Sequence, residues 1–281
     1  MTNRGVTETG SVLDRIVADW RTPLEEAKRV APVEALRAQI DTYGPQWSLT
    51  AAITTPRGAA PAGAAVQIVA EIKKASPSRG VLAEILDPVA IAEAYTNAGA
   101  AAISIVTEPN HFLGDLRWLR AVRQQLEKAQ AGTRPSLLRK DFIFDSYQLL
   151  QARAYGADNA LLIVAMLDDA LLRDLLDESR ALDLDALVEV HTEGEAERAI
   201  KAGATLFGIN NRDLNTFKVD LAVTERVRPV LPPDAVVIGE SGVHTRADVE
   251  RLHRAGVRAI LVGEAFMTAP DVAAKMAELR L

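Results

Sequence analysis

The chain has 281 residues, of which 48% are hydrophobic and 25% charged, with a net charge of −6 and no cysteine. This length allows a large hydrophobic core, and the lack of cysteine excludes disulfides, thiolate metal sites and a catalytic cysteine. The negative charge argues against bulk binding to nucleic acid or an anionic membrane, but a local site for an anionic small molecule stays open. No apolar run approaches the roughly 18 residues of a spanning helix, and the polar start does not resemble a signal peptide, so we expect a cytoplasmic protein.

The first 65 residues lie outside a repeating pattern that fills the rest of the chain. Apolar residues recur there at helical spacing and predict an amphipathic helix. They are Leu13, Ile16, Val17, Trp20, Leu24 and Ala27. The stretch 54–65 is rich in Gly, Pro and Ala and is typical of a linker. We therefore expect residues 1–65 to form a helical extension and linker, and residues 66–281 to complete a single domain.

A short sequence pattern occurs four times in the remaining chain. A helical pattern ends in a small residue and a glycine (Gly99, Gly156, Gly203, Gly256), and an apolar strand follows. Glycine suits the left-handed position that closes a helix. Runs that are apolar on both faces are typical of parallel strands covered by helices. With four further runs the pattern predicts eight strands, at 66–72, 101–106, 136–139, 160–164, 186–190, 206–209, 235–238 and 259–262.

Eight strands that alternate with helices over about 200 residues predict an α/β fold, a (β/α)₈ barrel with an N-terminal helical extension. Asp87 and Pro88 agree with this pattern, because Asp is a good N-cap and Pro suits the first helical position. A doubly wound open sheet is the alternative. Such sheets more often carry a Gly-rich first turn, and the first predicted strand is not followed by one.

Polar residues mark the carboxyl ends of several predicted strands, where the active site of such a barrel is built. Glu71 and Lys73 end the first strand and share one face, because side chains alternate along a strand. Lys140 ends the third strand, Glu189 lies near the end of the fifth, and Asn210 ends the sixth. Two lysines, two glutamates and an amide are therefore expected to meet at one barrel mouth.

Each of these residues also has a structural interpretation. Glu71 and Lys73 could form a purely structural ion pair, and Asn210 could cap a loop. Lys140 could reach solvent at the rim, and for Arg139 we expect that position. Glu189 is harder to explain in this way, because an unpaired carboxylate in an apolar strand costs several kcal/mol. It is therefore expected to be paired or functional.

Glycines follow the last two predicted strands, at residues 239–243 (GESGV) and 261–265 (LVGEA). They allow backbone N–H groups to approach a ligand, and the helix starts that follow favour an anion. The loops after strands seven and eight are the usual phosphate site of this fold. Ordinary turn glycines are the alternative. The four histidines show no metal-ligand spacing, so we expect no metal.

Five strings resemble, in order and spacing, those of indole-3-glycerol phosphate synthase. They are EIKKASPS at 71–78, LRKDFI at 138–143, LVEVH at 187–191, NNRDL at 210–214 and ESG at 240–242. The resemblance spans about residues 66–268. It implies a lyase of tryptophan biosynthesis that needs no cofactor. This family closes 1-(2-carboxyphenylamino)-1-deoxyribulose 5-phosphate to an indole ring, with loss of CO2 and water.

The resemblance also implies residue roles. Lys140 would donate a proton in ring closure and Glu189 would serve dehydration, with Lys73 assisting and Glu71 orienting the lysines. The substrate-binding residues would be Ser76, Phe112, Asn210 and Arg212, with Lys73 and Arg212 at the aryl carboxylate and Asn210 at a substrate hydroxyl or Glu189. The phosphate-binding residues would be Ser241, Gly242, Gly263 and the main chain of Glu264. We expect Lys140 and Glu189 on opposite walls, with Lys140 among cations and apolar groups.

Two other functions fit the same barrel. Phosphoribosylanthranilate isomerase acts on a related phosphosugar, but its family uses a cysteine base and this chain has none. A barrel that only binds phosphorylated metabolites, or serves as a scaffold, would have no need of Lys73, Lys140 and Glu189 together. The expected partner is a phosphorylated small molecule, without nucleic acid or membrane, and a monomer is expected.

Overall fold

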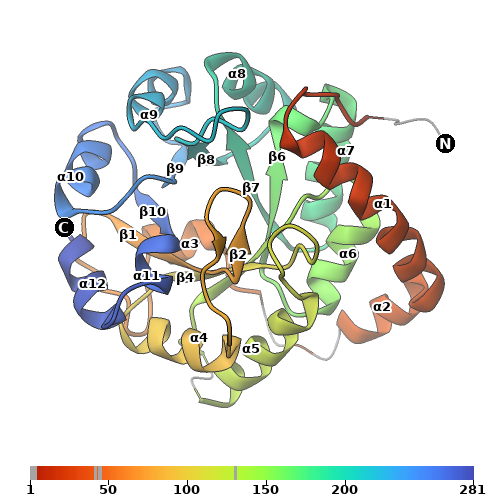
Figure 1. Cartoon of the computed structure of the whole chain (residues 1–281), viewed down its shortest axis with the longest axis horizontal. Coiled ribbons are helices and arrows are strands. Elements are labelled where there is room, and N and C mark those ends of the chain that lie inside the picture. The colour runs from red at the N-terminus through yellow and green to blue at the C-terminus, as the bar shows by residue number, and fades with distance from the viewer. Residues whose placement is uncertain (1–4, 41–42, 44–45, 130–131) are drawn as a thin grey trace.

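Eight parallel strands close into a barrel in the computed structural model, which describes residues 5–40, 43, 46–129 and 132–281. β1 pairs with β4 on one side and with β10 on the other, which closes the ring at the centre of Figure 1. The strands are β1 (Gln67–Ile72), β4 (Ala102–Val106), β5 (Ser136–Lys140), β6 (Asn159–Ile163), β7 (Asp185–Val190), β8 (Leu206–Asn210), β9 (Val236–Glu240) and β10 (Ala259–Val262). The predicted (β/α)₈ barrel is confirmed, and the open sheet is wrong.

Helices surround the barrel and bury its outer face. They are α4 (Pro88–Asn97), α5 (Leu116–Ala129), α6 (Ser146–Ala154), α7 (Asp169–Ala181), α8 (Glu193–Ala202), α9 (Ala222–Val227), α10 (Arg246–Arg254), α11 (Glu264–Met267) and α12 (Val272–Leu279). Asp87 caps α4 by accepting hydrogen bonds from the backbone N–H groups of Val89 and Ala90, as predicted. The four glycines of the repeated sequence pattern have φ between 86° and 93°, so the predicted left-handed positions are confirmed.

The helix predicted in the first 65 residues is α1 (Val12–Val30), and α2 (Val33–Ile40) and α3 (Leu49–Thr54) follow it. α1 lies beside α6 and α7 at one side of the barrel mouth (Figure 1). The buried residues of α1 are Leu13, Ile16, Val17, Trp20 and Leu24, all of them predicted. The indole N–H of Trp20 donates to Asp141, 2.9 Å away, and Lys28 forms an ion pair with Asp145 at 2.7 Å. These bonds fasten α1 to the loop that follows β5.

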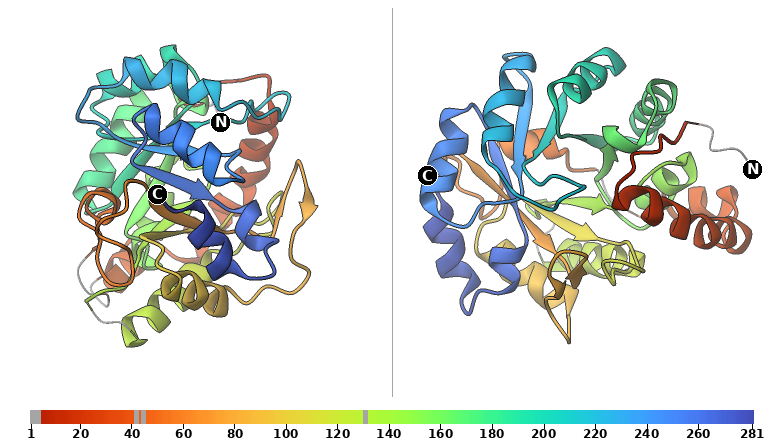
Figure 2. Two further views of the ribbon diagram at one scale, coloured as in Figure 1. Left: turned by 90° about the vertical axis from the view of Figure 1, so that its left-hand side faces the viewer. Right: turned by 45° about the horizontal axis from the view of Figure 1, so that its top comes forward.

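A small hairpin in the loop after β1 was not predicted. It is formed by β2 (Ala75–Ser76) and β3 (Gly80–Val81), which pair in antiparallel fashion. The hairpin stands out from the body of the barrel in both views of Figure 2. Strands of two residues are too short to show a period of two in the sequence.

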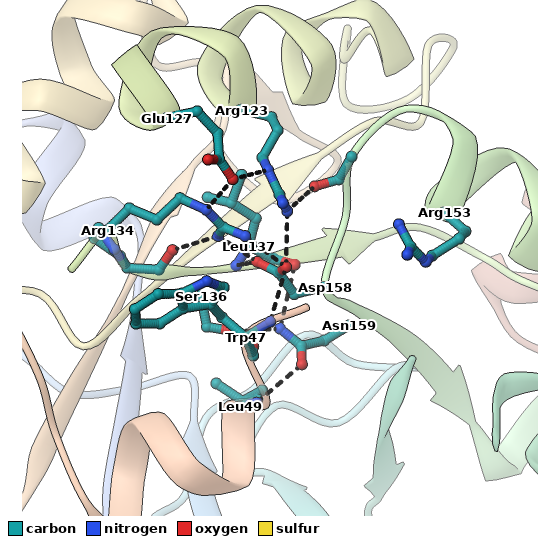
Figure 3. Close-up of polar contacts among 12 residues, drawn as sticks. Trp47, Leu49, Arg123, Glu127, Arg134, Ser136, Leu137, Arg153, Asp158 and Asn159 are labelled. Carbon is teal, nitrogen blue, oxygen red and sulfur yellow. Dashed lines mark hydrogen bonds and ion pairs between the residues drawn. The ribbon is translucent and has the colours of Figure 1, made fainter. Parts of the chain in front are cut away.

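A buried carboxylate at the start of β6 joins three parts of the fold (Figure 3). Asp158 accepts hydrogen bonds from the guanidinium groups of Arg123 and Arg134, at 2.6–2.9 Å. It also accepts from the backbone N–H groups of Leu137 and Trp47, at 2.8 and 3.1 Å. Asp158 and both arginines are almost fully buried. This cluster therefore ties the segment before α3 to α5 and to the amino-terminal end of the barrel.

We expect the substitution Asp158→Asn to lower the free energy of unfolding by about 3–5 kcal/mol, because it removes the buried carboxylate that pairs with Arg123 and Arg134 and leaves them to the more exposed Glu127. Asp177→Asn is the matched control. It removes an exposed i,i+3 ion pair with Arg180, for which a loss below about 1 kcal/mol is expected. Urea unfolding of the two variants measures both values. Equal losses would show that the buried cluster is not a major source of stability.

Candidate active site

A cavity opens at the carboxyl ends of the strands and extends under α1. Every residue predicted for the site lines this cavity: Glu71, Lys73, Ser76, Phe112, Lys140, Glu189, Asn210, Arg212, Ser241, Gly242, Gly263 and Glu264. They come from strands, and from the segments that follow them, far apart in the sequence, and the closure of the barrel brings them together. Further residues that were not predicted from the sequence also line the cavity.

The first pair of charges in the cavity is Glu71 with Lys73. The ammonium of Lys73 donates to Oε2 of Glu71 at 2.5 Å, and the Glu71 side chain is buried. Burial alone would raise the pKa of Glu71, but the charges of Lys73 and Lys140 outweigh it and lower the pKa. Glu71 is therefore ionised at neutral pH and holds Lys73 at the mouth of the barrel.

Lys140 lies between two carboxylates. Its Nζ is 3.2 Å from Oε2 of Glu189 and 2.6 Å from Oε2 of Glu240. Burial alone would lower the pKa of Lys140, but the charges of Glu240, Glu189 and Glu71 raise it above its usual value. The expectation that Lys140 sits among cations is therefore wrong, because the neighbours of its ammonium are anions. Lys140 keeps its proton at neutral pH.

The expectation that Lys140 and Glu189 face each other from opposite walls is also wrong. β5 and β7 are separated by β6 alone, so their inward side chains are neighbours across the barrel interior. In barrels of this kind, alternate strands contribute the side chains of one interior layer. Glu71, Lys140, Glu189 and Glu240 come from the first, third, fifth and seventh strands and follow this rule.

Glu189 is paired on both of its oxygens. Oε2 contacts Lys140, and Oε1 accepts a hydrogen bond from Asn210 at 3.0 Å and lies 3.3 Å from Nε2 of His191. Burial alone would raise the pKa of Glu189, but the charge of Lys140 and the contacts with His191 and Asn210 lower it below its usual range. Glu189 is therefore held as a carboxylate, positioned to accept a proton.

Glu240 is the charged residue that the sequence analysis missed. Its side chain is buried, and its Oε1 has no hydrogen-bond partner among the described residues. Burial raises the pKa of Glu240 to about 7. Gly208 makes room for this carboxylate, since a Cβ there would collide with Oε1. The alternate-strand rule, applied to the end of the seventh strand, could have identified it.

Arg139 is not a rim residue, and that expectation is wrong. Its side chain is fully buried and forms an ion pair with Asp141 at 2.9 Å. It also donates to the backbone carbonyl of Gln148 in α6 at 2.6 Å. Because Lys140 points into the barrel, its neighbour Arg139 points outward to the helices. Asp141, which also accepts from Trp20, links this outer network to α1.

An apolar wall faces the charged group. The rings of Phe112 and Phe142 lie 5.8 Å apart, tilted by 39°. Val12, Leu13 and Ile16 of α1 add aliphatic groups to the cavity lining. Phe142 and the α1 residues were not assigned to the site from sequence, because a helical period shows that a face is apolar but not which surface it covers. The wall suits a flat aromatic group beside Lys73 and Arg212.

The loops after β9 and β10 form the opposite end of the cavity. Ser241 and Gly242 both have positive φ, 61° and 83°, so the chain turns sharply after β9. A Cβ at Gly263 would collide with the carboxylate of Glu71, so glycine is needed for the close approach of the two strands. The Glu264 side chain is engaged by Arg79 of the hairpin loop at 2.9 Å.

Among the described residues, no group of three or more His, Asp or Glu side chains could hold a metal ion. Among the helices described, none has the length and apolar character needed to cross a membrane.

The sequence matches a family model described as indole-3-glycerol phosphate synthase over residues 13–279. Proteins of that name from Dehalococcoides mccartyi (strain CBDB1) and Mycolicibacterium smegmatis are 47% and 41% identical. The first alignment covers 95% of this chain and 99% of the relative, and the second covers 96% and 94%.

Solved structures share the barrel at much lower identity. A 3-hexulose-6-phosphate synthase has a TM-score of 0.55 at 18% identity, over 76% of this chain and 98% of that chain. A tryptophan synthase α2β2 complex from Pyrococcus furiosus has a TM-score of 0.55 at 13% identity, over 77% and 97%. These likenesses show the fold alone. The family match over residues 13–279 and the relatives at 41–47% identity show that the chain belongs to the indole-3-glycerol phosphate synthase family.

Proposed function

We propose that the cavity performs the reaction of this family on 1-(2-carboxyphenylamino)-1-deoxyribulose 5-phosphate and forms indole-3-glycerol phosphate. The observation that carries the proposal is the charged group of Glu71, Lys73, Lys140 and Glu189, set between an apolar wall and two glycine-containing loops. The substrate has the matching parts: an aryl carboxylate, a carbonyl and a phosphate.

The phosphate end of the substrate is assigned to the loops after β9 and β10. Ser241, Gly242, Gly263 and the main chain of Glu264 provide hydroxyl and backbone N–H groups there. The aryl group lies against Phe112 and Ser76, and its carboxylate is assigned to Lys73 and Arg212. An anion that leaves water needs such compensation. These two anchors place the carbonyl carbon of the ribulose chain near Lys140.

Ring closure joins the aromatic carbon that bears the carboxylate to the ribulose carbonyl carbon. The carbonyl oxygen becomes a hydroxyl by taking a proton from the ammonium of Lys140. Loss of CO2 returns its bonding electrons to the ring and restores aromaticity. The new hydroxyl then leaves as water with a proton donated by Lys73, and Glu189 takes up the proton that leaves the carbon next to the ring nitrogen. Glu189 serves this dehydration, Lys73 assists, and Glu71 orients Lys73.

We also propose that the protein is a cytoplasmic monomer, that it folds as one domain, and that it needs no metal or other cofactor. Turnover by the purified protein tests its catalytic part. Added substrate should give the fluorescence of an indole product. If substrate binds but no indole forms, the protein is a non-catalytic barrel that binds phosphorylated metabolites, and the proposed function is wrong.

The phosphate assignment predicts that Gly242→Ala raises KM about tenfold or more. A Cβ at Gly242 would collide with Val219 and displace the loop, and a hydrogen bond to a charged group contributes about 1.5–3 kcal/mol. Gly203→Ala is the matched control, because Gly203 also has positive φ but closes α8 outside the cavity. The KM values of both variants, measured by steady-state kinetics, separate the effect of backbone strain from the loss of the phosphate site. Equal KM values in the two variants would contradict the assignment.

A further inference from the structure

His191 follows β7 directly and lies between two carboxylates. Its Nε2 is 3.3 Å from Oε1 of Glu189, and its Nδ1 is 3.2 Å from Oε2 of Glu195 in α8. The same Glu195 oxygen accepts the backbone N–H of His191 at 2.8 Å, which fixes the two residues to each other. The His191 side chain is 11% exposed. With a carboxylate at each ring nitrogen, the site suits an imidazolium that carries both protons.

The surroundings of His191 favour its charged form. Burial alone would lower its pKa, but Glu189 and Glu195 outweigh burial and raise the pKa to about 10. Asp213, in the loop after β8, adds a third negative charge on this side. The pKa of Asp213 is lowered by hydrogen bonds from Thr216 and, to a smaller extent, by the charge of His191. His191 is therefore cationic at neutral pH.

The contact of His191 with Glu189 acts through charge. At 3.3 Å it is an ion pair, and Nε2 does not have hydrogen-bond geometry toward any described residue. His191 is also absent from the residues that line the cavity, whereas Glu189 lines it. His191 therefore contacts the cavity-lining group through Glu189.

Glu189 and Glu240 differ in their partners beyond Lys140. Both are buried, and both contact the ammonium of Lys140. Beyond Lys140, Glu189 has a second cation in His191 and a hydrogen bond from Asn210. Glu240 has neither, and its Oε1 is buried without a partner among the described residues. The two carboxylates would otherwise compete for one proton through their shared lysine.

We propose that His191, held by Glu195, is a positioning residue that makes Glu189 the ionised base of this carboxylate pair and leaves the shared proton on Glu240. It adds a cation to a group in which the carboxylates of Glu71, Glu189 and Glu240 are paired with Lys73 and Lys140. The inference rests on the proposed function for the role of Glu189, and it adds the feature that assigns this role to Glu189 rather than Glu240.

The pH dependence of kcat is the first test. In the wild type, the proton taken up near pH 7 goes to Glu240, so Glu189 stays ionised below that pH. His191→Gln removes the cation, the pKa of Glu189 rises, and the acidic limb of kcat should move up by about 1–3 pH units. His191→Lys restores the charge and should restore the limb. His253→Gln, on the exposed face of α10, is the control and should not move it.

Nuclear magnetic resonance gives a readout independent of turnover. The signals of ¹⁵N-labelled histidine, assigned by their loss in His191→Gln, should show His191 doubly protonated up to about pH 9, and Glu195→Gln should lower that pH. The ¹³C signals of the side-chain carboxyls, assigned with Glu189→Gln and Glu240→Gln, should show the first proton on Glu240 in the wild type. In His191→Gln they should show Glu189 taking up its proton at a pH about 1–3 units higher than in the wild type.

The inference is overturned if His191 loses its proton near pH 6.5, or if His191→Gln changes neither the pH at which Glu189 takes up its proton nor the acidic limb. A limb that moves equally in His191→Gln and His191→Lys would assign a packing role instead and would also overturn it. A wild-type protein without turnover would contradict the proposed function, while the two resonance titrations would still decide the role of His191.

Discussion

Replacing Lys140 with methionine should lower kcat by about 10²–10⁴-fold, the usual effect of losing a positioned proton donor. Methionine keeps an unbranched side chain, one heavy atom shorter than that of lysine, but cannot protonate the carbonyl oxygen in ring closure. KM should change little, because the phosphate loops and Lys73 with Arg212 remain. Lys201→Met, at an exposed position of α8, should leave kcat unchanged. Steady-state kinetics of indole formation compare the two variants, and a Lys140→Met enzyme with near-normal kcat would show that another group is the acid.

Replacing Glu189 with glutamine should also lower kcat about 10²–10⁴-fold, but at a later step. The amide keeps the volume of the carboxylate and a hydrogen-bonding oxygen for Asn210, yet it cannot take up a proton in dehydration. The ring-closed compound that still carries its hydroxyl should therefore accumulate. Glu197→Gln, exposed on α8, is the control. Rapid quenching and separation of the products identifies the compound that accumulates. If Glu189→Gln is defective in substrate binding alone, the assigned role is wrong.

The parts of the fold that the sequence predicted depend on local physical rules. The helix-closing glycines, the N-cap at Asp87 and the apolar strands each reflect the conformation or burial of a few neighbouring residues. Strand order then follows from chain order in a (β/α)₈ barrel. For this reason Glu71, Lys140 and Glu189 could be placed at one mouth without knowledge of any contact between them.

The predictions that were wrong or missing concern residues whose partners lie on other strands or helices of the barrel. The alternation of side chains places Lys140 inside and Arg139 outside, but the partners of each are supplied by other strands and helices. Glu240 lies in a string that was considered only for its glycines. The apolar face of α1 was visible in the sequence, whereas its position over the cavity depends on bonds such as that of Trp20 to Asp141.

A single-turnover experiment with excess enzyme tests most directly whether Lys140 acts in ring closure and Glu189 in dehydration. The wild type, Lys140→Met and Glu189→Gln are each mixed with substrate, quenched over time and separated. The account predicts complete conversion to indole-3-glycerol phosphate by the wild type, unreacted bound substrate with Lys140→Met, and a ring-closed, undehydrated compound with Glu189→Gln. Product formation at the wild-type rate by Lys140→Met, or only unreacted substrate with Glu189→Gln, would contradict it.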